Sequence, residues 1–238
     1  MRAAFQVVTA WVLTAWVLTG CGSGGGPPAP VAPPAPAVPC LDVGAEAAYV
    51  ECLQRANDAV WQTRFAGAGR SYVSPRLTVP DQAPRSDRTR DRAFFNARTG
   101  VHFPTTYLDD VRAAHGEHAR IVLSFTVAHE TGHHVQWLVR PRLRAPTRDI
   151  ELQADCYAGM WARSQVAVGD LDPAVFREGA VAELRRLSAD PEEVDSHGAV
   201  DERVASLDRG LAAGDPEACD VGTLTWLPAP TPGVVVTG

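Results

Sequence analysis

The sequence predicts a predominantly helical α+β fold, a single domain with a small β-sheet. Two observations lead to this prediction. Several long segments carry apolar residues at helical spacing, and only one short segment alternates as a strand does. Setting aside the amino-terminal leader and linker leaves about 180 residues, enough for one domain. Because 45% of the residues are apolar, this length can bury a single core.

The first helix is expected over residues 42–65, and Gly67 ends it. Its apolar positions at helical spacing include Tyr49, Leu53, Val60 and Trp61. Residues 71–79 alternate loosely and indicate a strand. Little other strand is expected.

Apolar residues 121–128 run without a helix breaker into the pentad 129–133, and residues 135–139 continue the run until Pro141. This pattern predicts a buried helix. A second helix is expected over residues 149–165, after the connection 141–147. Later, Asp172 and Pro173 have the residue types of an N-cap and a first helical position, and they predict a helix to about Leu187. Residues 199–213 predict a last helix, stopped by Gly214.

The pentad His129-Glu130-Thr131-Gly132-His133 is the clearest chemical signal. Residues four apart lie on the same face of a helix, so His129 and His133 can direct both imidazoles at one point. Glu130 projects beside that face, where it can act on a metal-bound water without ligating the ion. A metal would also satisfy polar groups that are costly to bury in so apolar a helix. The pattern is typical of a zinc peptidase.

A catalytic zinc takes three protein ligands, and Glu151 is the candidate for the third. It lies in the first turns of the helix expected to face the histidine helix. Asp155 follows four residues later on the same face, where it could accept a hydrogen bond from the second ring nitrogen of His129. Taken alone, the two carboxylates would be read as an ordinary acidic helix start.

Three segments together resemble the neutral zinc metallopeptidases, relatives of the gluzincins. They are residues 128–136 (AHETGHHVQ), residues 151–162 (ELQADCYAGMWA), and Ser196-His197-Gly198 with Glu202-Arg203. The resemblance extends over roughly residues 40–220. It implies a zincin-like metallopeptidase domain that holds one Zn²⁺ per chain.

For individual residues, the resemblance implies His129, His133 and Glu151 as zinc ligands, Glu130 as the general base and Asp155 as the residue that orients a histidine. It points to His197 as a stabiliser of the oxyanion and to Arg203 as support for substrate or oxyanion. One stretch departs from the family pattern: Gly-Val-His-Phe-Pro-Thr-Thr at 100–106 stands where a Gly-Pro-Phe-Tyr-Cys-Pro stretch is common. The edge of the cleft is therefore expected to differ.

The amino terminus resembles a bacterial lipoprotein leader. Residues 1–20 have the basic and apolar regions of a signal peptide, and Leu18-Thr19-Gly20-Cys21 matches the site at which such a leader is cleaved and Cys21 is lipidated. A transmembrane anchor is the rival interpretation, but the apolar run is shorter than the roughly 20 residues that span a membrane. Residues 21–39 read as a Pro/Gly/Ala-rich tether, residues 40–220 as the catalytic domain and residues 221–238 as a flexible tail. The domain is expected to be extracytoplasmic, attached to the outer face of the cell membrane.

Four cysteines remain besides Cys21, an even number that suggests two disulfides in an exported domain. The sequence allows three pairings. Cys40–Cys52 with Cys156–Cys219 is the preferred one. Zinc ligation by cysteine is the rival interpretation, although no CxxC spacing occurs.

Charge excludes one class of partner. The net charge is −6, and all 22 basic residues are arginine, which gives no footprint for nucleic acid. One arginine cluster, at residues 140–148, joins the two expected site helices; it either borders the cleft or is a solvated connection. His134 points off the ligand face and is read as structural, and no motif surrounds His102, His115 or His118.

These observations predict a zinc-dependent peptidase that acts on peptide or protein substrates, with Glu130 as the base for a metal-activated water. The alternative is a non-catalytic zinc-binding envelope lipoprotein, for which ligands but no base would be needed. A zinc hydrolase for a non-peptide bond is a third possibility.

Overall fold

A computed structural model of the chain describes residues 38–40, 43–81, 92–188 and 197–227. All of them belong to one compact unit, residues 32–238. The predicted signal peptide, the lipidation site Cys21 and the tether as far as residue 37 lie outside the described residues. Within the described part of the chain, no helix is both long enough and apolar enough to cross a bilayer.

The structure confirms a mostly helical α+β domain with a small sheet. Its elements in order are α1 (Glu46–Gly67), β1 (Leu77–Thr78), β2 (Phe94–Asn96), β3 (Gly100–His102), α2 (Thr105–His115), a 3₁₀ turn (Gly116–His118), α3 (Ala119–Val139), α4 (Thr147–Ala167), α5 (Pro173–Leu187), α7 (Val200–Ala213) and a second 3₁₀ turn (Pro216–Cys219).

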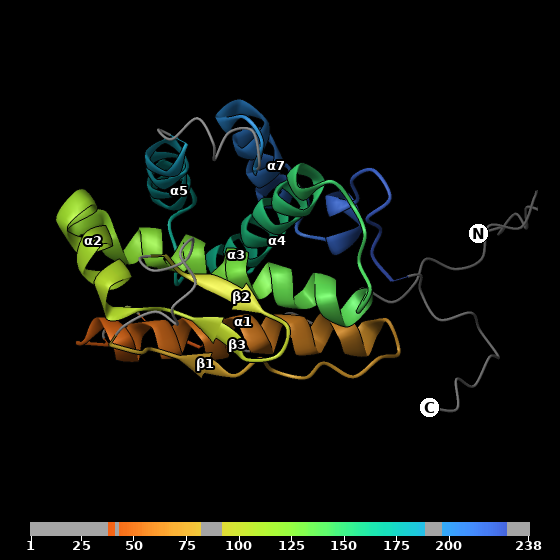
Figure 1. The fold of residues 1–238 in the computed structure, drawn as a ribbon, viewed down its shortest axis with the longest axis horizontal. Helices are drawn as coiled ribbons and strands as arrows, with labels where there is room; N and C mark the ends of the chain where they lie inside the picture. Colours follow the sequence, from red (N-terminus) through yellow and green to blue (C-terminus); the bar gives the residue numbers. More distant parts are fainter. Residues whose placement is uncertain (1–37, 41–42, 82–91, 189–196, 228–238) are drawn as a thin grey trace, which may run out of the picture. The chain divides into compact units, whose positions relative to one another are not determined.

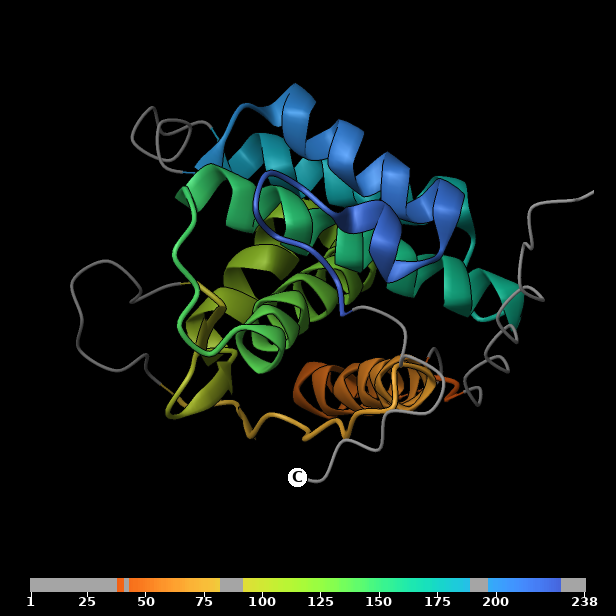
Figure 2. The ribbon, with the colours of Figure 1, turned by 90° about the vertical axis from the view of Figure 1, so that its right-hand side faces the viewer.

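Helix α3 is the centre of the arrangement, because it contacts α1, α2, α4 and α5 (Figure 1). Helix α4 packs on one side of α3 and α1 on another, and α7 lies against α4 (Figure 2). Such a central helix must be apolar nearly all round. Accordingly, the α3 residues from Val122 to Gly132 are all buried.

The sheet is small and lies beside α3. Its strand order is β1-β3-β2, with β1 parallel and β2 antiparallel to β3. The strand expected over residues 71–79 is limited to Leu77–Thr78. Elements β2, β3 and α2 were not predicted from the sequence. The strands of this sheet have only two or three residues, too few to show an alternating pattern.

Helix ends follow the expected chemistry. The carboxylate of Asp172 accepts hydrogen bonds from the backbone N–H groups of Ala174 and Val175 at 2.9 and 3.0 Å, and so caps α5. Gly214 ends α7 in the left-handed conformation, with φ 74°.

Helices α4 and α7 approach unusually closely through two glycines. A Cβ at Gly159 would lie 2.2 Å from the carbonyl oxygen of Leu207, and a Cβ at Gly210 would lie 2.0 Å from that of Cys156. Neither position can hold a side chain unless the helices separate. This close approach brings the residues of α7 within reach of those on α4.

The first residues of the predicted flexible tail are part of the domain. Leu224, Trp226 and Leu227 are buried, and the indole of Trp226 packs against Trp61 and Phe65 of α1. Trp226 and Leu227 therefore belong to the core, where the Trp226 indole packs against Trp61 of α1 and Tyr157 of α4. Residues 228–238 lie outside the described part.

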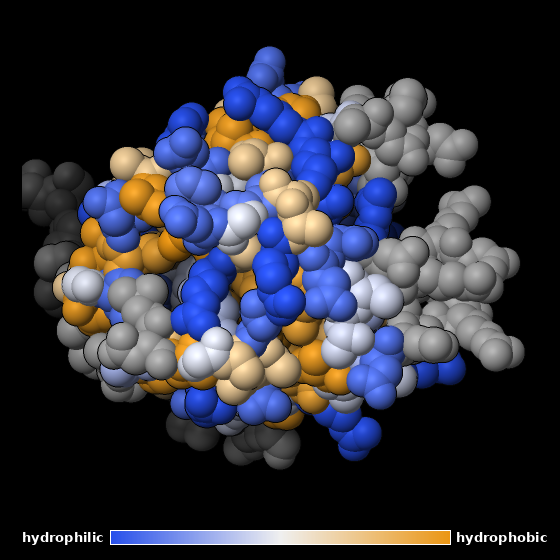
Figure 3. Space-filling view, turned by 90° about the vertical axis from the view of Figure 1, so that its left-hand side faces the viewer, coloured by the Kyte–Doolittle hydropathy of each residue, from blue (hydrophilic) through white to orange (hydrophobic). Residues whose placement is uncertain are grey.

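Hydrophilic and hydrophobic side chains are interspersed on the face of the molecule seen in Figure 3. Among the described residues, the exposed large hydrophobic side chains are Val73, Val168 and Val175.

Candidate metal centre

The two histidines of the pentad meet a carboxylate of α4. On α3, Nε2 of His129 lies 3.1 Å from Nε2 of His133. The oxygens of Glu151 lie 3.2 Å from Nε2 of His129 and 3.4 Å from Nε2 of His133. Four donor atoms from three residues therefore face one point. In the described part of the chain, this is the group of His, Cys, Asp or Glu side chains that could hold a metal ion.

The hydrogen-bond partners of the histidines show why a cation belongs at this point. Nδ1 of His129 lies 2.9 Å from Oδ1 of Asp155, and Nδ1 of His133 lies 3.0 Å from Oε1 of Gln136. Both partners are acceptors, so each Nδ1 carries a proton and donates it, in the tautomer that a neutral imidazole needs to bind a metal through Nε2. The two Nε2 atoms then present lone pairs to each other and to the Glu151 carboxylate.

Electron-rich atoms this close repel unless a cation lies among them. Donor atoms about 2.0–2.2 Å from a tetrahedral zinc ion are about 3.3–3.6 Å apart, near the separations that the three side chains have without one. The residues thus fit a zinc ion in chemistry and in spacing.

The electrostatics of the site agree with this fit. Burial opposes ionisation of Glu151, but the neighbouring His133, His129 and Arg203 outweigh burial and hold the pKa of its carboxyl well below the ordinary value. Burial also lowers the pKa of His129, yet the hydrogen bonds to Asp155 and Glu151 prevail and raise it to about 10. His129 therefore takes up a second proton at neutral pH when no metal ion is bound, and the surroundings favour a positive charge at this point, either a proton or a metal ion.

Asp155 is held by a buried arginine. The guanidinium of Arg203, on α7, donates from Nε to Oδ2 of Asp155 at 2.7 Å and from a terminal nitrogen to Oδ1 at 2.9 Å. Asp155 is fully buried and Arg203 is 4% exposed, so the bidentate pair is shielded from water. Arg203 keeps the pKa of Asp155 lowered despite burial. The carboxylate thus remains an acceptor for the Nδ1–H of His129.

This position differs from the role expected for Arg203. The Arg203 guanidinium binds Asp155, and one of its nitrogens lies 3.6 Å from Glu151. Both of these partners are side chains of the protein. The contacts of the guanidinium are with Asp155 and Glu151 in the buried part of the site.

The remaining predicted residues lie around the same point. Glu130 is 8% exposed, and its carboxylate makes no hydrogen bond to another described residue. His197 comes from the segment before α7, its Nε2 lies 3.9 Å from Oε1 of Glu151, and its side chain is 34% exposed. The structure therefore brings His197 to the exposed side of the cluster. Cys21 lies outside the described residues.

His134 is directed away from the cluster. Its Nε2 lies 2.6 Å from the backbone carbonyl of Val73, as a structural histidine on the opposite face of α3 would be. Of the arginines at residues 140–148, Arg148 in the first turn of α4 donates to both carboxylate oxygens of Glu202 on α7, at 3.0 and 2.5 Å. This pair joins α4 to α7 next to His197.

Among the described residues, Cys40 is bonded to Cys52 and Cys156 to Cys219, which is the pairing preferred from the sequence. The second bond begins one residue after Asp155. It attaches the segment after α7 to the site helix.

A second buried polar network lies nearer the start of α3, and the sequence analysis did not identify it. The fully buried carboxylate of Glu183, on α5, accepts a bidentate pair of hydrogen bonds from Arg186, both at 2.7 Å. It also lies 2.8 Å from Nε2 of His115 and accepts from the hydroxyl of Tyr107 at 3.2 Å. The Tyr107 hydroxyl lies 2.9 Å from Oγ1 of Thr126, one helical turn before Glu130.

Gln136, which accepts a hydrogen bond from His133, was also not identified from the sequence. Its position three residues after His133 was the available signal, since residues three apart share a helix face.

The chain is similar in sequence to known proteins. Residues 41–222 match the model of a family described as "Putative neutral zinc metallopeptidase". The chain is 26% identical over 202 residues to "Uncharacterized protein YpfJ" of Escherichia coli K12, covering 73% of this chain and 70% of that protein. The same values hold for the protein of that name from Escherichia coli O6:H1. No solved structure matches the chain.

Proposed function

The chain belongs to the neutral zinc metallopeptidase family, and we propose that it is a zinc-dependent peptidase that hydrolyses peptide bonds with one zinc ion per chain. The observation that carries the proposal is the convergence of ligand atoms of His129, His133 and Glu151 beside Glu130. The Glu130 carboxylate makes no hydrogen bond to another described residue. A binding site alone would need the three ligands. It would not need a carboxylate left available beside them.

In this proposal His129, His133 and Glu151 hold the ion, and Asp155 keeps His129 in the tautomer and orientation that ligation requires. Zinc, when bound, would supply Lewis-acid chemistry that acidifies a water molecule and polarises a carbonyl group. Glu130 takes the proton from the attacking water and delivers it to the leaving amine.

His197 donates a hydrogen bond to the oxygen on which negative charge develops. Its position supports this role, since it lies at the exposed side of the cluster where a substrate carbonyl can approach. Peptides or proteins are the proposed substrates, because the family is one of peptidases.

We also propose that the domain works outside the cytoplasm, attached to the membrane through a lipid on Cys21. The two disulfides support an oxidising compartment. Mass analysis of the exported protein tests the attachment: the expected product begins at Cys21 and carries acyl groups, and a product that retains residues 1–20 would contradict it.

The proposed reaction is tested with purified domain, zinc and a mixed peptide library read by mass spectrometry. The parent should cleave peptides. Glu130→Gln should retain one zinc per chain and lose cleavage, whereas His133→Ala and Glu151→Ala should lose both. His134→Gln is the matched control, because this adjacent histidine faces the Val73 carbonyl and should leave zinc content unchanged.

Each other outcome points to a different function. Cleavage by Glu130→Gln at the parent's rate would refute the role of Glu130 as base. Stoichiometric zinc without cleavage of any peptide by the parent would favour the non-catalytic zinc-binding lipoprotein or a hydrolase for another bond. His197→Ala should bind zinc like the parent and turn over on the order of 10²-fold more slowly. Unchanged turnover would return His197 to a surface role.

A further inference from the structure

The hydrogen bonds that begin at His133 continue through two buried glutamines to the carboxyl-terminal part of the domain. Nε2 of Gln136 donates to the carbonyl of Ile150 at 2.7 Å and to Oε1 of Gln153 at 3.2 Å. Nε2 of Gln153 donates to the carbonyl of Leu224 at 3.3 Å. Gln136 is 4% exposed and Gln153 is 3% exposed, so water does not compete for these groups.

Two backbone carbonyls, those of Ile150 and Leu224, fix the direction of the hydrogen bonds in this series. The Leu224 carbonyl can only accept, so Gln153 must turn its NH₂ group toward Leu224 and its oxygen toward Gln136. Gln136 must then turn its NH₂ group toward Gln153 and Ile150, and its oxygen toward His133. That oxygen can only accept, so Nδ1 of His133 carries the proton and Nε2 keeps the lone pair.

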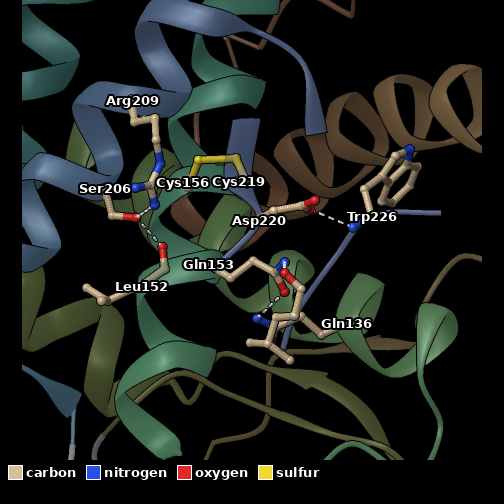
Figure 4. The surroundings of a disulfide bond; sticks show 10 residues. Gln136, Leu152, Gln153, Cys156, Ser206, Arg209, Cys219, Asp220 and Trp226 are labelled. Atoms are coloured by element: carbon tan, nitrogen blue, oxygen red, sulfur yellow. Dashed lines mark hydrogen bonds between the residues drawn. A yellow bond between two sulfur atoms is a disulfide. The ribbon is translucent and has the colours of Figure 1, made fainter. Parts of the chain in front are cut away.

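The backbone at Leu224 is itself held in place. Residues 220–227, here called the carboxyl-terminal segment, begin beside the Cys156–Cys219 disulfide (Figure 4). The carboxylate of Asp220 accepts from the backbone N–H of Trp226 at 2.6 Å, and Leu224 exchanges two backbone hydrogen bonds with Val221. The Leu224 carbonyl thus has a defined position.

From this geometry we infer that Gln136, Gln153 and the carboxyl-terminal segment position His133 and fix its tautomer for metal binding. Gln136 and Gln153 act as positioning residues. Neither is one of the proposed ligands. Through their amide groups, the acceptor carbonyl of Leu224 determines which way the side chain next to His133 is turned. This inference rests on the proposed metal site, and it adds a carboxyl-terminal element that the ligand pattern does not contain.

The competing explanation is that the two glutamines only satisfy each other in the core. Gln165 allows the two explanations to be separated. It lies on α4, like Gln153, it is also 4% exposed, and its amide donates to Ser164, away from the metal cluster. Replacing it changes a buried glutamine without changing the surroundings of His133.

The test measures zinc affinity by chelator competition and thermal unfolding of the zinc-free protein for the parent and for Gln136→Met, Gln153→Met and Gln165→Met. Methionine preserves the length of the side chain and removes its hydrogen bonds. Gln136→Met should weaken zinc binding about 10–100-fold, the range for residues that orient a ligand histidine. Gln153→Met should weaken it in the same direction by a smaller factor, and Gln165→Met should leave it unchanged.

Two further measurements separate positioning from folding. The visible absorption of the cobalt-substituted protein reports ligand geometry, and it should change in Gln136→Met and Gln153→Met but not in Gln165→Met. Asp220→Ala loosens the carboxyl-terminal segment without altering either glutamine. It should lower zinc affinity several-fold, which keeps the test decisive if a glutamine variant does not fold.

Failure of this inference and failure of the proposed metal site give different results. If the parent binds neither zinc nor cobalt, the metal site is wrong, and the positioning role is refuted with it. If the parent binds zinc and all three glutamine variants match it in affinity and cobalt spectrum, the metal site stands. The glutamines then only fill the core.

Discussion

A single methyl group at position 210 should disturb the metal centre from a distance of two helical turns. In Gly210→Ala the new Cβ would lie 2.0 Å from the carbonyl oxygen of Cys156, whereas ordinary contacts begin at 3.4 Å. Helices α4 and α7 must therefore separate locally by up to the difference, 3.4 − 2.0 = 1.4 Å. Arg203, on the same helix as Gly210, reaches Asp155 by hydrogen bonds of 2.7 and 2.9 Å, and such a displacement breaks them.

The magnitude follows from two costs. Overpacking a close helix contact costs about 1–3 kcal/mol, and leaving one member of a buried ion pair without its partner costs about 3–5 kcal/mol. The better helix propensity of alanine returns only about 1 kcal/mol. A loss of at least about 3 kcal/mol in the free energy of unfolding is therefore expected.

The assay is urea unfolding of the zinc-free protein, followed by zinc affinity measured by chelator competition. Gly44→Ala is the control, because a Cβ at that position meets no atom within 4 Å. Zinc binding by Gly210→Ala should weaken together with its stability. Stability within about 0.5 kcal/mol of the parent would refute the reasoning, since that is the effect of an ordinary surface substitution.

Three more predictions follow from the buried groups. Asp155→Ala should lower zinc affinity about 10–100-fold, as measured by chelator competition, because His129 loses its acceptor; parental affinity would contradict this. Reduction of Cys156–Cys219 should lower the unfolding free energy by about 4 kcal/mol before zinc is lost, which melting curves with and without reductant measure. The pKa of Glu183 is lowered in the fold, so its stabilising effect is complete above the ordinary value of 4.5 and is lost as pH falls through the folded value. The stability difference between parent and Glu183→Gln should shrink on acidification below that value, and a constant difference in urea unfolding across pH would count against the assignment.

The site helices could be predicted from sequence because their signals are local. Spacing of four residues places two imidazoles on one face, and the apolar run around them predicts a buried helix whatever it packs against. The Asp172 cap and the Gly214 stop are similarly local. The pairing of α4 with α7 was not predictable, since it depends on Gly159 and Gly210 meeting backbone atoms far away in the chain.

The carboxyl-terminal segment shows the same limit. The expected tail began at residue 221, and the apolar residues Leu224, Trp226 and Leu227 were the available signal that its first residues pack on the domain. Their burial depends on a surface formed by α1 and α4, which no local pattern reveals. The bidentate pair of Arg203 and Asp155 likewise depends on the packing of α7 against α4, which the sequence did not predict.

The network around Glu183 bears on whether the domain folds before or after it binds a metal ion. Tyr107 contacts Thr126 one turn before Glu130, and Asp155 contacts His129 on the next turn, so α3 is fastened to α2 and α5 near one end of the pentad and to α4 within it. A helix fastened at two levels cannot roll about its axis without breaking both sets of hydrogen bonds. The imidazoles are then aimed before any ion arrives. Unlike small zinc-nucleated domains, whose chains are unfolded without metal, this protein should fold first and load afterwards, so that zinc can be removed and returned while the scaffold persists.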